Sequence, residues 1–216
     1  LQQMKFDFLA QELVNLPFEF GVFYLRHPHE EKGRVNSIVI KEMLTVTGNG
    51  VSTLQELILN KDRAKLQWKK LQTSFQDRLH NVIAAGEVVE LVSIGNHCLG
   101  TTFLNGNHLI SERLHESFDR ISKQVGGFYF GRFDLRCESA EALQNGNVKI
   151  LELNGCGAEP AHIYHPGFPI TEALQVLVQH WRNIYLIARA NVRNGARYTS
   201  FREAKAYYKK FKNSIQ

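Results

Sequence analysis

The sequence has few cysteines, and it lacks any long uninterrupted run of hydrophobic residues. Its 216 residues include three cysteines, an odd number with no closely spaced pair, which favours a reducing compartment. No run approaches the roughly 18 apolar residues of a membrane-spanning helix. The first residues also lack the basic and then apolar stretch of a secretory signal. We therefore expect a cytoplasmic protein with no membrane partner.

The excess of positive charge is confined to the carboxyl-terminal end. The formal net charge is +5, and residues 196–216 carry six Lys or Arg against a single acid. A nucleic-acid-binding protein usually spreads a basic stripe over its folded surface. We therefore do not expect nucleic acid as a partner, although basic tails can meet phosphates. The capping-box pattern from Ser200 to Glu203 instead predicts a basic terminal helix over 196–216.

Residues 1–195 show no repeat and no obvious linker, so we expect them to form one unit. With 44% hydrophobic residues, the chain can fill a substantial core. Apolar runs and turn signals predict strands at 18–26, 34–40, 88–94 and 98–104. Helical spacing and caps predict a short helix after Thr53, one or two helices over 61–83, and helices over 111–125 and 171–194.

The last of these predicted helices carries a broad apolar stripe. Its members recur at helical intervals, and we expect ordinary core packing to bury them. They are Leu174, Leu177, Val178, Trp181, Ile184, Tyr185 and Ala188.

A strand-like run over 128–136 carries two polar residues, Arg132 and Asp134. Side chains along a strand alternate between its two faces with a period of two. This alternation predicts that Phe128 and Phe130 share a face with Arg132 and Asp134. That face would change from apolar to charged along the run.

A second strand-like run follows over 148–154 and carries Glu152 and Asn154. The same alternation predicts that Ile150, Glu152 and Asn154 share one face. Because the intervening 144–147 is turn material, we expect the two runs to pair as antiparallel neighbours.

Such pairing would bring two carboxylates and an amide together. Oxygen ligands from Asp134, Glu152 and Asn154 suit Mg2+, which is usually held by one or two carboxylates together with substrate phosphates. The spacing alone leaves a hairpin with one solvated face equally open.

The arrangement Arg-x-Asp and then Glu-x-Asn, ahead of a Gly-rich loop, resembles the metal and phosphate end of the ATP-grasp ligases. Residues 10–22 are similar to that family's hinge strand, which recognises adenine by backbone groups and is followed by an acid for the ribose. The resemblance implies a nucleotide-binding hinge followed by a ribose-binding acid. The hinge residues would be Glu12, Leu13, Val14 and Asn15, and the acid would be Glu19.

Two further segments, 47–57 and 85–100, resemble the cyanophycin synthetase branch of that family, which forms amides from carboxylates and amines. Four motifs in the expected order are more specific than any one of them. The resemblance runs from about residue 8 to residue 166. It implies an α+β fold, the carboxyl-terminal lobe of an ATP-grasp domain, with a mostly antiparallel sheet flanked by helices.

The resemblance also implies the chemistry. ATP would be the cosubstrate, with Mg2+ or Mn2+, and an acyl phosphate would link a small-molecule carboxylate to an amine or amino acid. Asp134 and Glu152 would hold one metal ion, and Glu152 would bridge to a second that Asn154 completes. Arg132 would meet the transferring phosphoryl group, and it could also form a salt bridge to Asp134. Asn96 could line the phosphate site or shape a turn.

ATP-grasp ligases build the nucleotide site between two lobes, whereas this chain begins almost at the hinge. We therefore expect it to be the carboxyl-terminal part of a longer polypeptide whose first lobe precedes residue 1. A catalytically degenerate nucleotide-binding module of the same fold is the alternative.

The loop over 155–166 departs from the family pattern where the acceptor substrate is usually contacted. Gly155, Glu159 and His162 could contact substrate there, or they could belong to an ordinary polar loop.

A zinc protein is a third hypothesis. It is suggested by His27-x-His29, His97-Cys98, and Cys156 with His162-x-x-His165, although none has the paired short spacing of structural zinc sites.

Overall fold

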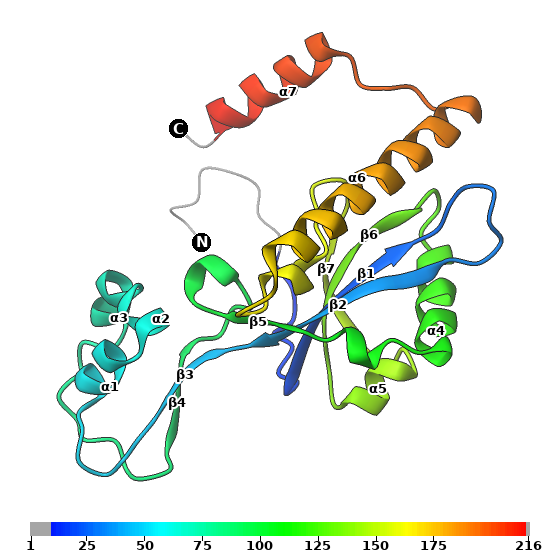
Figure 1. The fold of residues 1–216 in the computed structure, drawn as a ribbon. Coiled ribbons are helices and arrows are strands. Elements are labelled where there is room, and N and C mark those ends of the chain that lie inside the picture. Colours follow the sequence, from blue (N-terminus) through cyan, green and yellow to red (C-terminus); the bar gives the residue numbers. More distant parts are fainter. Residues whose placement is uncertain (1–9, 215–216) are drawn as a thin grey trace.

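Five strands form the main sheet of the computed structural model, which describes residues 10–214 (Figure 1). The spatial order is β5-β2-β1-β6-β7, and every neighbouring pair is antiparallel. The prediction of an α+β fold with a mostly antiparallel sheet flanked by helices is confirmed. The strands are β1 Phe18–Leu25, β2 Arg34–Glu42, β5 Thr102–Asn105, β6 Phe130–Cys137 and β7 Lys149–Asn154.

One face of this sheet packs on helices α4 (Glu112–Lys123) and α5 (Ala140–Gln144). Helix α4 begins where predicted, because the Ser111 hydroxyl accepts a hydrogen bond from the Leu114 N–H at 3.2 Å. Alternate residues of β1 and β6 point to this side and form a buried cluster with the two helices. Its fully buried members include Val22, Tyr24, Ile38, Leu114, Phe118, Phe133, Leu135 and Leu143.

The opposite face is covered by helix α6 (Ile170–Arg193) over only part of its area (Figure 1). The His180 ring meets the Phe23 ring edge-on, with centroids 5.2 Å apart. Glu19 and Gly21, which share the face of Phe23, lie toward the other end of β1. That end of the sheet carries the polar site described below.

A second, two-stranded sheet pairs β3 (Leu44–Thr47) with β4 (Val88–Val92). Three short helices pack on it around a core of its own: α1 Leu54–Asn60, α2 Asp62–Lys65 and α3 Trp68–Ser74. The predicted capping box of α1 is present, with Thr53 and Glu56 bonded to each other's backbone N–H groups. Strand β3 was not predicted.

The predicted strand over 98–104 is wrong in its first half. A 3-10 turn, His97–Leu99, occupies that part, and Gly100 ends it with a φ of 101°. Residues before β5 therefore form a loop that reaches across to the polar end of the main sheet.

The prediction that core packing buries the apolar stripe of α6 is wrong for its largest members. Val178 and Trp181 are 64% and 60% exposed, and Leu174 and Tyr185 are exposed as well. The buried side of the helix is the opposite one, and its buried residues are His180, Asn183 and Ile187.

Helix α7 (Phe201–Ser214) follows α6 after a short connection and stands apart from the main sheet (Figure 1). The Ser200 capping box is formed: the Ser200 hydroxyl accepts from the Glu203 N–H at 3.3 Å, and the Glu203 carboxylate accepts from the Ser200 N–H at 2.8 Å. Among residues 10–214, no helix is both long and apolar enough to cross a membrane.

Candidate functional site

A cavity of about 960 Å³ opens over the polar end of the main sheet. Strands β1, β2 and β6 form its floor, residues 11–15 form one wall, and the loop over 93–97 forms another. The cavity brings together most of the residues singled out in the sequence. Those that line it are Glu12, Leu13, Val14, Asn15, Glu19, Asn96, Arg132, Asp134 and Glu152.

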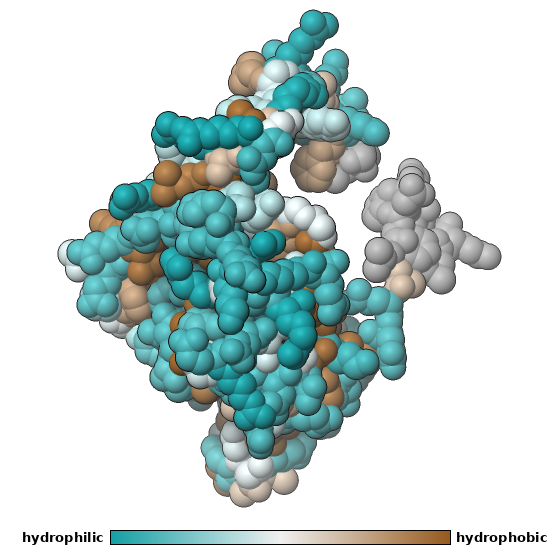
Figure 2. Space-filling model, turned by 90° about the vertical axis from the view of Figure 1, so that its right-hand side faces the viewer, coloured by the Kyte–Doolittle hydropathy of each residue, from teal (hydrophilic) through white to brown (hydrophobic). Residues whose placement is uncertain are grey.

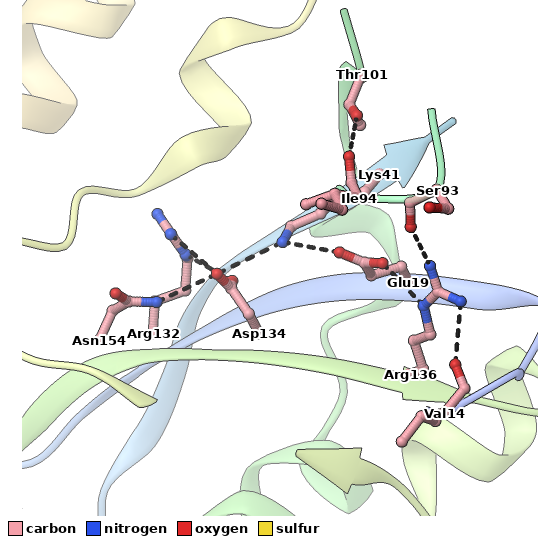
Figure 3. Close-up of polar contacts among 10 residues, drawn as sticks. All are labelled: Val14, Glu19, Lys41, Ser93, Ile94, Thr101, Arg132, Asp134, Arg136 and Asn154. Carbon is pink, nitrogen blue, oxygen red and sulfur yellow. Dashed lines mark hydrogen bonds and ion pairs between the residues drawn. The ribbon is translucent and has the colours of Figure 1, made fainter. Parts of the chain in front are cut away.

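Charges of alternating sign cross the floor of this cavity (Figure 3). Arg136 Nε lies 2.9 Å from Glu19 Oε2, and Lys41 Nζ lies 3.1 Å from Glu19 Oε1. Lys41 Nζ also lies 3.4 Å from Asp134 Oδ2, and Arg132 Nε lies 2.8 Å from Asp134 Oδ1. The three inner side chains are nearly fully buried, and buried charges are tolerated only when they are paired in this way.

Strand register explains why these charges meet. Glu19 of β1 stands opposite both Lys41 of β2 and Arg136 of β6. Directly opposed residues of antiparallel strands place their side chains side by side on one face. Lys41 and Arg136 were not assigned a role from the sequence. For Lys41, the available signal was a cation directly after the apolar residues Ile38–Ile40 of β2.

Gly21 makes room for this arrangement. It stands opposite Asp134, and a Cβ there would lie 2.7 Å from Val39 Cγ1 and 3.1 Å from both Asp134 Oδ1 and Arg132 Cδ. Any larger residue would push the Arg132 and Asp134 pair out of place. Gly95 has the same role in the loop above, where a Cβ would collide with the Glu19 carboxylate.

The predicted antiparallel pairing of the two polar runs is confirmed. Asp134 of β6 opposes Glu152 of β7, and Arg132 opposes Asn154. Asn154 Nδ2 donates a hydrogen bond to Asp134 Oδ2 at 3.2 Å, while Glu152 is exposed to solvent. The connection is longer than a simple turn because helix α5 precedes the turn at Gly146.

Two of the predicted face assignments are wrong. Phe128 lies before β6 begins, and its ring packs 5.3 Å from that of Phe133 on the core face. A bulge follows Asp134, so that Leu135 pairs with Ile150; Ile150 therefore lies on the face of Leu135 and not on that of Glu152, and it stays 45% exposed there. A bulge inserts one residue and reverses the expected alternation, which sequence spacing alone does not reveal.

The oxygen ligands on this hairpin suit a hard cation, although those of Asp134 are engaged by protein cations here. Both Asp134 oxygens accept from Arg132, at 2.8 and 3.1 Å, in the fork geometry typical of guanidinium and carboxylate. A divalent ion bound by Asp134 and Glu152 would therefore compete with Arg132 for Asp134. No group of three or more His, Cys, Asp or Glu within residues 10–214 is placed to hold a metal.

Arg136 makes hydrogen bonds to three parts of the cavity lining. Besides Glu19, it donates to the carbonyl oxygens of Val14 and Ser93, each at 3.1 Å (Figure 3). Val14 belongs to the predicted hinge and Ser93 to the loop after β4. One side chain thus sets the spacing between the hinge, the predicted ribose acid and the opposite wall.

Asn96 both lines the cavity and shapes its wall. Its Oδ1 accepts from the Cys98 N–H at 2.9 Å and caps the 3-10 turn. The Thr101 hydroxyl donates to the Ile94 carbonyl at 3.1 Å and closes the same loop. His97 packs edge-on against Phe103, and burial, together with the Arg63 charge, lowers its pKa.

None of the three residues predicted to contact substrate, Gly155, Glu159 and His162, lines the cavity. Glu159 accepts a hydrogen bond from the Tyr164 hydroxyl at 2.7 Å, which together with burial raises the pKa of Tyr164 to about 12. The Glu159 carbonyl accepts from Arg132 at 3.4 Å, so this loop contacts the site through its backbone. His162 is buried, its Nδ1 has no hydrogen-bond partner in the described part of the chain, and burial lowers its pKa.

Comparison with known proteins adds little to this geometry. No family model and no curated protein matches the sequence. A crystal structure of a bifunctional glutathione synthetase from Pasteurella multocida is 16% identical, with a TM-score of 0.43. The match covers 69% of this chain and 22% of the synthetase, so the chain spans about a fifth of that protein.

Proposed function

We propose that this chain carries the nucleotide- and metal-binding part of an ATP-dependent ligase that joins a carboxylate to an amine. One observation carries the proposal: a single cavity gathers the hinge-like segment, the acid Glu19 and the polar residues Arg132, Asp134 and Glu152 from segments far apart in the chain. A solvated hairpin would not require such convergence. The ATP-grasp-like order of the motifs supports the same proposal.

In this proposal, backbone groups of residues 12–15 bind the adenine, and the Glu19 carboxylate accepts hydrogen bonds from the ribose hydroxyls. Each Glu19 oxygen already accepts a hydrogen bond, one from Lys41 and the other from Arg136. A carboxylate has about four acceptor positions, so Glu19 can still accept hydrogen bonds from two hydroxyls. Arg136 is a positioning residue, because it holds Glu19 and the Val14 carbonyl at a fixed separation.

Asp134, Glu152 and Asn154 would hold Mg2+ or Mn2+, which when bound neutralises charge on the phosphate oxygens. Arg132 would then leave the Asp134 carboxylate and meet the phosphoryl group in transfer. A guanidinium suits that role because its planar fork stays charged and donates to two oxygens at once. Lys41, which is buried on the cavity floor, supplies a second positive charge near the phosphates.

The reaction follows from the inertness of a carboxylate toward an amine. Its oxygen is a poor leaving group, so the γ-phosphoryl of ATP is first transferred to it, with release of ADP. The amine then attacks the acyl phosphate and expels inorganic phosphate. In the first step the protein's contribution is to position the reactants and neutralise charge.

The variant Glu152→Gln tests this proposal. Glu152 is exposed, so the free energy of unfolding should stay within about 0.5 kcal/mol of wild type. ADP release from ATP with pooled carboxylates and amines should fall by at least about 10²-fold in the full-length protein, as for loss of one electrostatic contributor. Glu116→Gln is the matched control, because Glu116 is also exposed and lies on α4, across the sheet.

Wild-type rates of ADP release in both Glu152→Gln and Asp134→Asn would show the metal assignment to be wrong. A wild-type protein that binds ATP with Mg2+ and releases no ADP would instead support the degenerate nucleotide-binding module.

A further inference from the structure

A second cavity, of about 440 Å³, lies at the far end of the main sheet from the first. It is formed by the β1–β2 connection and the carboxyl-terminal half of α6, and its lining includes His27, His29, Arg189 and Arg193. His27 comes eight residues after Glu19, which places this cavity on the order of 25 Å along the strand direction from the first. The side of the molecule with this connection and this end of α6 is predominantly hydrophilic (Figure 2).

The two arginines of this cavity are unpaired within the described chain. Arg189 and Arg193 are one helical turn apart on α6, where like charges repel. The side chain of neither makes a hydrogen bond or an ion pair with any residue of 10–214, although every arginine and lysine side chain of the first cavity is paired. The two guanidiniums therefore remain available to a ligand.

The β1–β2 connection presents two imidazoles to the same space and is held in shape by its own hydrogen bonds. The Glu30 carboxylate accepts from the His27 N–H at 3.0 Å, and the Glu30 N–H donates to the His27 carbonyl at 2.9 Å. The rings of His27 and His29 lie 5.6 Å apart. Glu30 is the only acid of the lining, so the lining has a net positive charge.

We propose that this cavity binds a small molecule through a phosphoryl group. A phosphoryl group has three terminal oxygens and up to two negative charges, so it can accept from both guanidiniums and from an imidazole at the same time. A carboxylate has two oxygens and one charge, and it would leave part of this donor set unused. Leu186 provides an apolar wall for the remainder of the ligand.

The proposal is tested with pyrophosphate as the probe and the imidazole signals of the full-length protein as the readout. Proton–carbon NMR spectra should show saturable shifts of the His27 and His29 signals, which are assigned from His27→Gln and His29→Gln. These signals report on this cavity alone, so the result does not depend on nucleotide binding at the first cavity.

Affinity measured from these shifts should fall at least about tenfold for Arg189→Gln and for Arg193→Gln, since hydrogen bonds to charged groups contribute that much or more. Arg182→Gln is the matched control: it removes the same charge from an exposed position of the same helix, outside the cavity. The proposal would be overturned if the His27 and His29 signals did not shift on addition of pyrophosphate. It would also be overturned if Arg182→Gln lost as much affinity as Arg189→Gln and Arg193→Gln. Equally tight binding of succinate would overturn the assignment of a phosphoryl group.

Discussion

Replacing Lys41 by methionine should destabilise the protein strongly, because the lysine is the shared partner of two buried acids. Its Nζ lies 3.1 Å from Glu19 and 3.4 Å from Asp134, and all three side chains are at most 8% exposed. Methionine keeps most of the apolar length of the side chain and removes the charge. Glu19 and Asp134 would then face each other with no cation between them.

The size of the effect follows from the pairs that remain. Breaking a buried ion pair by removing one partner costs about 3–5 kcal/mol. Glu19 keeps Arg136 at 2.9 Å, and Asp134 keeps Arg132 at 2.8 Å, which favours the lower end, about 3 kcal/mol. For a chain of this length, that corresponds to a fall in Tm of about 6–12 °C.

The assay is thermal unfolding followed by circular dichroism, with urea denaturation for the free energy. Lys149→Met is the matched control, because Lys149 is exposed on β7 and should change the free energy of unfolding by at most about 0.5 kcal/mol. Adding Glu19→Gln to Lys41→Met should recover part of the loss, since one of the two facing charges disappears. The reasoning is refuted if Lys41→Met unfolds like Lys149→Met, or if the double variant is no more stable than Lys41→Met.

Three further predictions concern other parts of the fold. Tyr24→Phe should lose about 2 kcal/mol in urea denaturation, because it removes a buried 2.6 Å hydrogen bond to the Asp119 carboxylate; an unchanged midpoint would contradict this. Burial lowers the pKa of His162 and of His180 below the usual 6.5, so their contribution to stability should be complete above about pH 6.5 and lost as the pH falls through the lowered values. Thermal unfolding at stepwise lower pH should show this loss, and His162→Phe should show less of it. Trp181 is 60% exposed, so iodide should quench its fluorescence, and Trp181→Phe should remove most of the quenching.

Much of the fold could be predicted because it depends on short-range patterns. The apolar runs of β1 and β2 fall within a few residues of their predicted bounds, and the caps at Thr53 and Ser111 start helices where expected. A cap satisfies backbone N–H groups within one turn of the helix. Both partners of the hydrogen bond therefore lie within a few residues of each other and can be recognised in the sequence.

The wrong predictions concern features that are decided by contacts between residues far apart in the sequence. The stripe on α6 has the spacing of a core-facing helix, yet the sheet receives the side that carries His180 and Ile187. Amphipathic spacing shows that a helix has an apolar side but does not say which side meets the sheet. The bulge after Asp134 has no local signature either, and it places Ile150 opposite Leu135, on the other face from Glu152.

For the candidate site, the sequence alone determined the types of residue and the pairing of two strands. Arg132, Asp134, Glu152 and Asn154 were recognisable because polar residues interrupt apolar strands at a period of two, which is a property of the local backbone. Only the tertiary structure decided which charges meet across strands. Lys41 and Arg136 acquire their positions from the register of β1 with its two neighbours, and register depends on pairing between segments more than a hundred residues apart, such as Glu19 and Arg136.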